Sequence, residues 1–229
     1  MGTGGPAPDQ LPAVTEGTGA TAADTGATPE GTGAARVEAA LGRGRPRSGE
    51  AHRAILDATR DLIIESGFAN LRLEHVATRA GVGKATIYRR WSSKEDLALE
   101  LLLELAAPHL AVVETGDTRD ELVAAVRNVV RALTETPFGP VIRALLSQIA
   151  INPALGDPFR ATVVQARRDE IAGVIARGVA RGDLRPDADA ELATELLVGP
   201  AYFRLMFGGE IGEELAEEVV DTVLSGFRA

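Results

Sequence analysis

The chain contains no cysteine, three histidines and few aromatic residues, which make up 4% of its 229 positions. The missing cysteine excludes disulfide bridges, thiolate zinc sites and cysteine nucleophiles together. His52, His75 and His109 lie far apart without metal-ligand spacing, so we expect no metal site. The sequence also has no recognisable serine–histidine–acid arrangement or nucleophile elbow. The residues therefore give no support to an enzyme, and we expect no cofactor.

Long apolar runs are also missing from this sequence. A membrane span needs about 18 consecutive apolar residues, so we expect no membrane partner. The N-terminus lacks a charged segment followed by an apolar one, which is the pattern of a secretory signal. With 45% hydrophobic residues, the composition is typical of a soluble globular protein, and we expect it in the cytoplasm.

Charge is unevenly distributed along the chain. Between Arg43 and Lys94 there are 11 Lys or Arg and 5 Asp or Glu, a net charge of +6, whereas the rest of the chain carries −15. A basic segment in an otherwise acidic chain is expected when one part meets phosphates. The alternative is a charged face that is merely solvated.

Residues 72–91 form two short helical patterns separated by a glycine. The first pattern repeats apolar residues at helical spacing: Leu73, Val76, Ala77 and Ala80. Gly81 can take the positive φ that a sharp turn between helices requires. The second pattern turns Val82, Ile87 and Trp91 inward and leaves a cationic outer face. Together they predict a helix-turn-helix, whose second helix enters the DNA major groove.

The stretch AGVGKATIYRRWSSKEDL, beginning at Ala80, resembles the DNA-binding signature of the TetR (tetracycline-repressor) family of bacterial transcriptional regulators. The resemblance extends from about Gly44 to Leu105. It implies an all-α fold with an N-terminal three-helix DNA-binding domain and a helical C-terminal domain for ligand binding and dimerisation. We divide the chain into a leader with a basic arm (1–47), the DNA-binding domain (48–108) and the effector-binding and dimerisation domain (109–229).

The resemblance also implies which residues contact double-stranded DNA. They are Arg72, Lys84, Ala85, Thr86, Tyr88, Arg89, Arg90 and Lys94. Tyr88 and Lys94 are expected on phosphates, and Arg90 on the backbone or in solvent. Lys84, Ala85 and Arg89 are expected nearest the base edges, where Lys or Arg can pair with guanine. Arg72 stands where relatives carry a capping Ser or Thr, so Asn70 or a backbone group must replace that cap.

The first 42 residues are of low complexity, because Ala, Gly, Thr and Pro account for 30 of them. Such a segment buries little apolar surface, which predicts a disordered leader. A start site placed too far upstream explains it equally well. Arg43, Arg45 and Arg47 follow in a string that resembles the core of an AT-hook and can reach into a minor groove. The alternative is a basic tail that adds only nonspecific affinity.

Two further motifs have simpler explanations. The string GVGKAT lacks the first glycine, the hydroxyl residue and the preceding strand of a phosphate-binding loop, so we reject that interpretation. Asp187 and Asp189 precede a helical pattern, where acids usually cap rather than bind metal.

The rest of the sequence predicts a series of helices. A capping box at Ser92–Glu95 precedes an almost wholly apolar helix. We expect this helix to link the helix-turn-helix at 72–91, the reading unit, to the C-terminal domain at 109–229, the body. Later helices are predicted at 118–135, 138–151, 159–181, 189–207 and 211–227, with a loop at 152–158.

The body is expected to dimerise and to enclose an effector. The helices at 159–181 and 189–207 are the dimerisation candidates. The second has more apolar positions than one core-facing stripe needs: Ala193, Leu196, Leu197, Pro200, Ala201, Phe203 and Leu205. Their alternative role is packing within one subunit. The candidate effector-lining residues are Leu105, His109, Phe138, Ile142, Leu146, Phe159, Tyr202 and Phe203.

The predicted function is a homodimeric regulator, a repressor rather than an activator, that a small molecule releases from a palindromic operator. One alternative is an architectural DNA-binding protein without an effector, which relies on the basic arm. Another is a small-molecule carrier or enzyme that does not bind DNA.

Overall fold

The computed structural model describes Met1, residues 35–37, residue 39 and residues 49–228. The basic arm with Arg43, Arg45 and Arg47, and most of the predicted leader, lie outside the described residues. All the helices described below lie within Gly31–Ala229. Within the range predicted to be disordered, Val37 is buried and Arg36 pairs with Asp169 at 2.7 Å.

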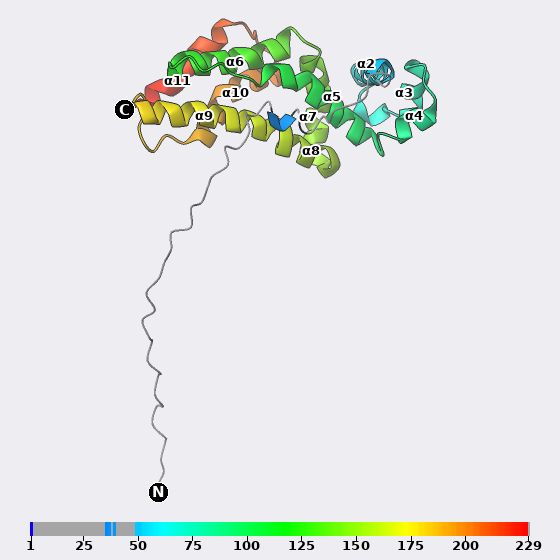
Figure 1. Cartoon of the computed structure of the whole chain (residues 1–229), viewed down its shortest axis with the longest axis horizontal. Helices are drawn as coiled ribbons and strands as arrows, with labels where there is room; N and C mark the ends of the chain where they lie inside the picture. Colours follow the sequence, from blue (N-terminus) through cyan, green and yellow to red (C-terminus); the bar gives the residue numbers. More distant parts are fainter. Residues whose placement is uncertain (2–34, 38, 40–48, 229) are drawn as a thin grey trace. The chain divides into compact units, whose positions relative to one another are not determined.

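The N-terminal head consists of α2 (Gly49–Ser66), the short turn η2 (Phe68–Asn70), α3 (Leu73–Arg79) and α4 (Lys84–Tyr88). Figure 1 shows α2, α3 and α4 grouped near one end of α5. The head's core is apolar and fully enclosed: Ile55, Ile63, Phe68, Leu71, Val76, Ile87 and Trp91. Gly81 has a φ of 66°, which confirms the predicted tight turn between α3 and α4.

Helix α5 (Lys94–Ala106) packs against α2 of the head and against two helices of the body, α7 and α8. Its residues Leu97, Leu101 and Leu102 are buried, which confirms that an apolar helix of this kind is covered on several sides. Its capping box lies one residue later than predicted. Ser93 accepts from the amide of Asp96, whose carboxylate in turn accepts from the amide of Ser93.

The body continues through η3 (Ala107–His109), α6 (Thr118–Thr134), α7 (Phe138–Ile151), α8 (Pro153–Phe159), the π-helical segment η4 (Arg160–Val164), α9 (Gln165–Arg181), α10 (Ala190–Phe207) and α11 (Glu214–Phe227). The described part of the chain has a single β contact, the bridge between Leu184 and Arg228. None of the described helices is both long and apolar enough to cross a membrane.

The predicted loop at 152–158 is wrong, because residues 153–159 form α8. Proline suits the first turn of a helix, where its missing N–H has no partner to lose. Pro153 occupies that position, and the Asn152 side chain accepts from the amide of Ala154. Asp189 likewise accepts from the amides of Glu191 and Leu192, which confirms its role as a cap of α10.

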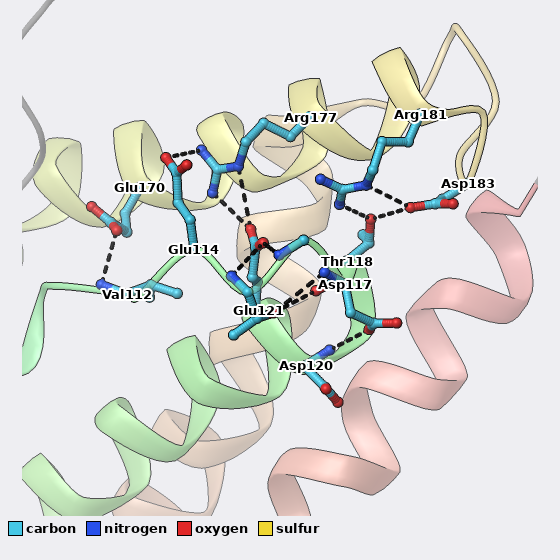
Figure 2. Close-up of polar contacts among 12 residues, drawn as sticks. Val112, Glu114, Asp117, Thr118, Asp120, Glu121, Glu170, Arg177, Arg181 and Asp183 are labelled. Atoms are coloured by element: carbon cyan, nitrogen blue, oxygen red, sulfur yellow. Dashed lines mark hydrogen bonds and ion pairs between the residues drawn. The ribbon is translucent and has the colours of Figure 1, made fainter.

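The long connection before α6 is held to α9 by a buried carboxylate. Glu121 has no exposed side-chain surface, and its Oε1 accepts from the amides of Thr115 and Gly116 at 3.0 and 2.9 Å. Its Oε2 accepts from Arg177 of α9 at 2.7 Å, as Figure 2 shows. Burial alone raises the pKa of Glu121, but these hydrogen bonds outweigh it and the pKa is lowered.

Thr118 makes a second close link between α6 and α9. Its hydroxyl donates to Asp183 at 2.8 Å and accepts from Arg181 at 2.6 Å (Figure 2). Gly178 permits this approach, because a Cβ there would lie 2.8 Å from the Thr118 hydroxyl oxygen. The two links fix one end of the body.

Candidate functional site

The outer face of α4 is the candidate DNA-reading surface. Lys84, Ala85, Tyr88 and Arg89 are exposed on it, and Thr86 is half-buried. Ile87 faces inward with no exposed surface and anchors this short helix to the head's core. Neither Lys84 nor Arg89 forms an ion pair with another described residue. Both cations are therefore available to an anionic partner.

Tyr88 is tied to the first helix of the reading unit. Its hydroxyl donates to Glu74 of α3 at 2.7 Å, and its side chain is 49% exposed. This hydrogen bond raises the pKa of Tyr88 and lowers the pKa of Glu74. The tyrosine is thus a neutral donor at neutral pH, and Glu74 places a negative charge beside the reading face. Sequence reasoning missed this acid because it lies on α3 rather than on the recognition helix.

Lys94 has an internal role in this structure. Its ammonium donates to the carbonyls of Phe68 and Ala69 at 3.1 and 3.3 Å and lies 4.5 Å from the centre of the Phe68 ring. The side chain therefore braces the turn after α2 against the start of α5. Its contact with a phosphate remains a prediction.

Arg72 precedes α3 and is exposed, and no side chain caps that helix at its position. Asn70 does not replace the cap, because its amide donates to the Ser66 carbonyl at the end of α2. The backbone carbonyl of Arg72 accepts from the amides of His75 and Val76. The predicted backbone alternative is therefore the one that the structure contains.

Trp91 connects the reading unit to α5. Its indole N–H donates to Glu100, and its ring stacks on His52 of α2 with centroids 5.7 Å apart. Arg90 lies over the same ring and pairs with Glu100 at 3.6 Å. Trp91 thus contacts α2 through His52 and α5 through Glu100, and it joins the end of the helix-turn-helix to both helices.

The same junction brings together three potential metal ligands that are distant in sequence. His52, Glu100 and Glu104 have donor atoms within 4.8 Å of one another. The histidine pairs with Glu104 at 2.8 Å. Glu100 accepts a hydrogen bond from the Trp91 indole and forms an ion pair with Arg90. Interactions between protein groups therefore account for the cluster.

The body encloses a cavity of ≈ 450 Å³, which we call the body cavity. Six of the eight predicted effector-lining residues border it: His109, Phe138, Ile142, Leu146, Phe159 and Tyr202. Leu105 and Phe203 do not border it, so their assignment as lining residues was wrong. Each is one position along its helix from a lining residue, Ala106 or Tyr202, and one residue rotates a side chain by about 100°.

Sequence reasoning missed the polar part of the body cavity. Arg167 of α9 borders it and is 9% exposed. Its Nη2 donates to the carbonyl of His109, but its buried Nη1 has no hydrogen-bond partner among the described residues. The preceding segment η4 contributes Arg160, Val163 and Val164 to the wall. No local pattern marks Arg167, because the cavity that it borders is lined by residues from several other helical segments.

The outer face of α10 carries exposed apolar side chains at helical spacing: Leu192, Leu196, Phe203, Met206 and Phe207. The rings of Phe203 and Phe207 lie 5.0 Å apart, and these residues are 63% and 77% exposed. The opposite face is buried within the subunit through Ala193, Leu197, Ala201 and Leu205. Packing inside one subunit therefore accounts for four of the predicted dimerisation residues.

Two family models match the two parts of this chain. Residues 55–101 match the bacterial regulatory proteins of the tetR family, and residues 112–223 match the tetracyclin repressor-like C-terminal domain. The HTH-type transcriptional regulator YdeS of Bacillus subtilis is 34% identical over 188 residues, which cover 82% of this chain and 94% of that protein. This chain belongs to the TetR family.

Two further TetR-family proteins match this chain over most of their own length. The DNA-binding transcriptional repressor TetR of Mycobacteroides abscessus is 29% identical and is matched over 80% of this chain and 95% of its own. The crystal structure of the TetR family regulator SCO0332 is 30% identical with a TM-score of 0.61, over 77% of this chain and 98% of that chain. The chain is therefore a DNA-binding transcriptional regulator with the all-α fold of this family.

Proposed function

We propose that this TetR-family regulator is a repressor that binds a palindromic operator as a homodimer and leaves it when a small molecule occupies the body cavity. The observation that carries the proposal is the exposed α4 face with Lys84 and Arg89 unpaired among the described residues. On this proposal, Arg89 and Lys84 form hydrogen bonds with base edges, and Ala85 and Thr86 pack against the bases. Tyr88 and Arg72 bind phosphates. Arg43, Arg45 and Arg47 add contacts in the flanking minor groove.

Dimerisation follows from the need to place two heads on one duplex. A palindromic site presents its half-sites about 34–36 Å apart, so one head cannot occupy both. The apolar outer face of α10, with Phe203 and Phe207, supports a pairing of this helix with its copy in a second subunit. Exposed rings of this size are otherwise unfavourable in water.

Release requires a path from the body cavity to the head, and α5 offers one. The cavity is bordered by Ala106 at the end of this helix and by His109 just after it. Near the start of α5, Glu95 accepts a hydrogen bond from Asn152 of the body at 3.2 Å. In the middle of α5, Glu100 accepts a hydrogen bond from the indole N–H of Trp91 in the reading unit. A ligand that displaces α5 changes the spacing of the two heads, and a coupling of about 1–3 kcal/mol changes DNA affinity roughly 5- to 150-fold.

The test is a footprint on the DNA that flanks the chain's own gene, combined with sedimentation of the purified protein. The proposal expects a two-fold symmetric protected site and a dimer in solution. Protection of A·T-rich DNA in general, without symmetry, would support the architectural alternative. A monomer that ignores duplex DNA at low salt in the absence of any effector contradicts the proposal.

A further inference from the structure

We infer that the body cavity binds a medium-chain organic monocarboxylate, with its carboxylate on Arg167 and its hydrocarbon chain among the apolar side chains. The inference rests on the proposed function for its regulatory meaning, but not for the binding itself. It follows from Arg167, a buried cation of the cavity wall whose hydrogen bonds are incomplete among the described residues.

Arg167 carries a charge that the protein itself leaves without a counter-ion. A buried guanidinium is normally paired with a carboxylate, because an isolated charge in an apolar environment is strongly unfavourable. No ion pair joins Arg167 to an acid within the described part of the chain. Glu170 lies one turn further along α9, but its Oε1 accepts the Val112 amide at 3.0 Å instead. Burial accordingly lowers the pKa of Arg167.

Arg160 provides the contrast within the same wall. It also borders the cavity, but its guanidinium is shared between Asp157 and the carbonyl of Ile149. Its charge is satisfied by the protein, so it has no need of a ligand. The two arginines therefore differ in whether the protein completes their hydrogen bonds. Of the two, Arg167 alone has a buried N–H without a partner among the described residues.

The neighbouring polar groups favour a single negative charge. Burial lowers the pKa of His109, with a further contribution from the charge of Arg167, so the imidazole is neutral at neutral pH. Burial also raises the pKa of Tyr202, whose hydroxyl makes no hydrogen bond with another described residue and stays protonated. One guanidinium and one hydroxyl match a carboxylate. A phosphate dianion would need more positive charge, and a neutral carbonyl would leave Arg167 uncompensated.

The rest of the cavity sets the size and character of the chain. The wall is made mainly of aliphatic and aromatic side chains: Leu110, Val129, Phe138, Ile142, Leu146, Ile149, Phe159, Val163 and Val198. At roughly 30 Å³ for each non-hydrogen atom, the volume of ≈ 450 Å³ holds about 15 such atoms. A carboxylate with about ten carbons fits this space without enlarging it.

Calorimetric titration of the full chain with decanoate, decan-1-ol and decylammonium tests the inference. The wild-type protein should bind one decanoate per subunit, roughly 10- to 150-fold more tightly than decan-1-ol, and should bind decylammonium most weakly. Equal affinity for the alcohol and the acid would overturn the inference, and so would an absence of decanoate binding.

Two variants separate the charge of Arg167 from its packing. Arg167→Met keeps the length of the side chain and should remove the preference for the acid over the alcohol, whereas Arg167→Lys should restore part of it. The matched control is Arg168→Met, which should leave the preference unchanged because Arg168 pairs with Glu191 of α10 at 2.9 Å and does not border the cavity. Thermal unfolding verifies that each variant is folded. A folded Arg167→Met protein that still prefers decanoate would contradict the assignment of the carboxylate to Arg167. If this variant does not fold, the relative affinity of the wild-type protein for decanoate and decan-1-ol still tests the ligand class.

A DNA-binding arm distinguishes failure of this inference from failure of the proposed function. Fluorescence anisotropy with a labelled operator is measured with and without saturating decanoate. Arg167-dependent decanoate binding without any effect on DNA affinity would support the ligand class and contradict effector-driven release. A protein that binds the operator normally, but binds decanoate no more tightly than decan-1-ol in both the wild type and Arg167→Met, would support the regulatory function and overturn the ligand class.

Discussion

Replacement of the buried carboxylate Glu121 by glutamine should destabilise the body without touching the DNA-reading face. Glutamine keeps the shape of the side chain, and its carbonyl oxygen can still accept from the amides of Thr115 and Gly116. Its amide nitrogen, however, would face the Arg177 guanidinium, which now binds Oε2 at 2.7 Å. The substitution therefore replaces an ion pair by two opposed donors.

The size of this effect follows from the burial of the two partners. Breaking a fully buried ion pair typically costs about 3–5 kcal/mol. Glu121 is fully buried, but Arg177 is 32% exposed and retains Glu114 at 3.1 Å, so its charge is not left isolated. We therefore expect a loss of roughly 1–3 kcal/mol in the free energy of unfolding, which lowers the Tm of a domain this size by about 2–12 °C.

Thermal unfolding followed by circular dichroism measures this change, with Glu114→Gln as the matched control. Glu114 binds the same arginine from the surface and is 69% exposed, so its replacement should change stability by less than about 0.5 kcal/mol. Equal Tm values for Glu121→Gln and wild type would refute the argument, because Arg177 has no second partner of comparable burial among the described residues.

The pH dependence gives an independent check on Glu121. Its pKa is lower in the folded chain than in the unfolded chain, where a glutamate has a value of about 4.3. Its ionisation therefore contributes fully to stability above that value, and the contribution is lost as the pH falls through the folded pKa. The stability difference between wild type and Glu121→Gln should shrink in acid. A difference that grows on acidification would show that the sign of the shift is wrong.

Three further predictions concern the DNA-reading face and the interface between subunits. Arg89→Ala should relax preference at one base pair at a cost of about 1–3 kcal/mol, measured by competition with single-base operator variants; unchanged base preference would exclude Arg89 from base readout. Glu74→Gln should tighten DNA binding roughly two- to five-fold at low salt, because it removes a negative charge beside the reading face that repels phosphate; weaker binding by anisotropy would contradict this. Phe203→Glu should give a monomer on sedimentation that no longer protects the operator, and a stable dimer would place the interface elsewhere.

The helix-turn-helix could be predicted in detail because its determinants are local. Apolar spacing defined α3, and Gly81 marked the turn that the structure realises with a φ of 66°. The capping box was displaced by one residue because Ser92 and Ser93 both precede an acid at a suitable distance, and Asp96 rather than Glu95 made the bonds. Local patterns thus identified the element but not its register.

The loop predicted before residue 159 shows a different limit. The predicted loop contains Pro153 and Pro158, yet Pro153 starts α8, and the backbone stays helical past Pro158 through η4 into α9. Proline position within a helix, rather than its presence, decides the outcome. The sequence alone did not define where this helix begins.

Arg167 shows why the chemistry of the body cavity lay beyond local reasoning. On its own helix it is one of several arginines, and Arg168 beside it pairs with Glu191 of α10 at 2.9 Å on the outer surface. A rotation of about 100° between adjacent residues separates a solvated ion pair from a buried, incompletely bonded cation. Which of the two arginines is buried depends on how α9 packs against α6 and α10, and the hydrogen bond from Arg167 to His109 spans more than 50 residues of sequence. The same packing places the His109 carbonyl against Arg167, so the residue inferred to select the ligand is hydrogen-bonded to the turn η3, which directly follows α5.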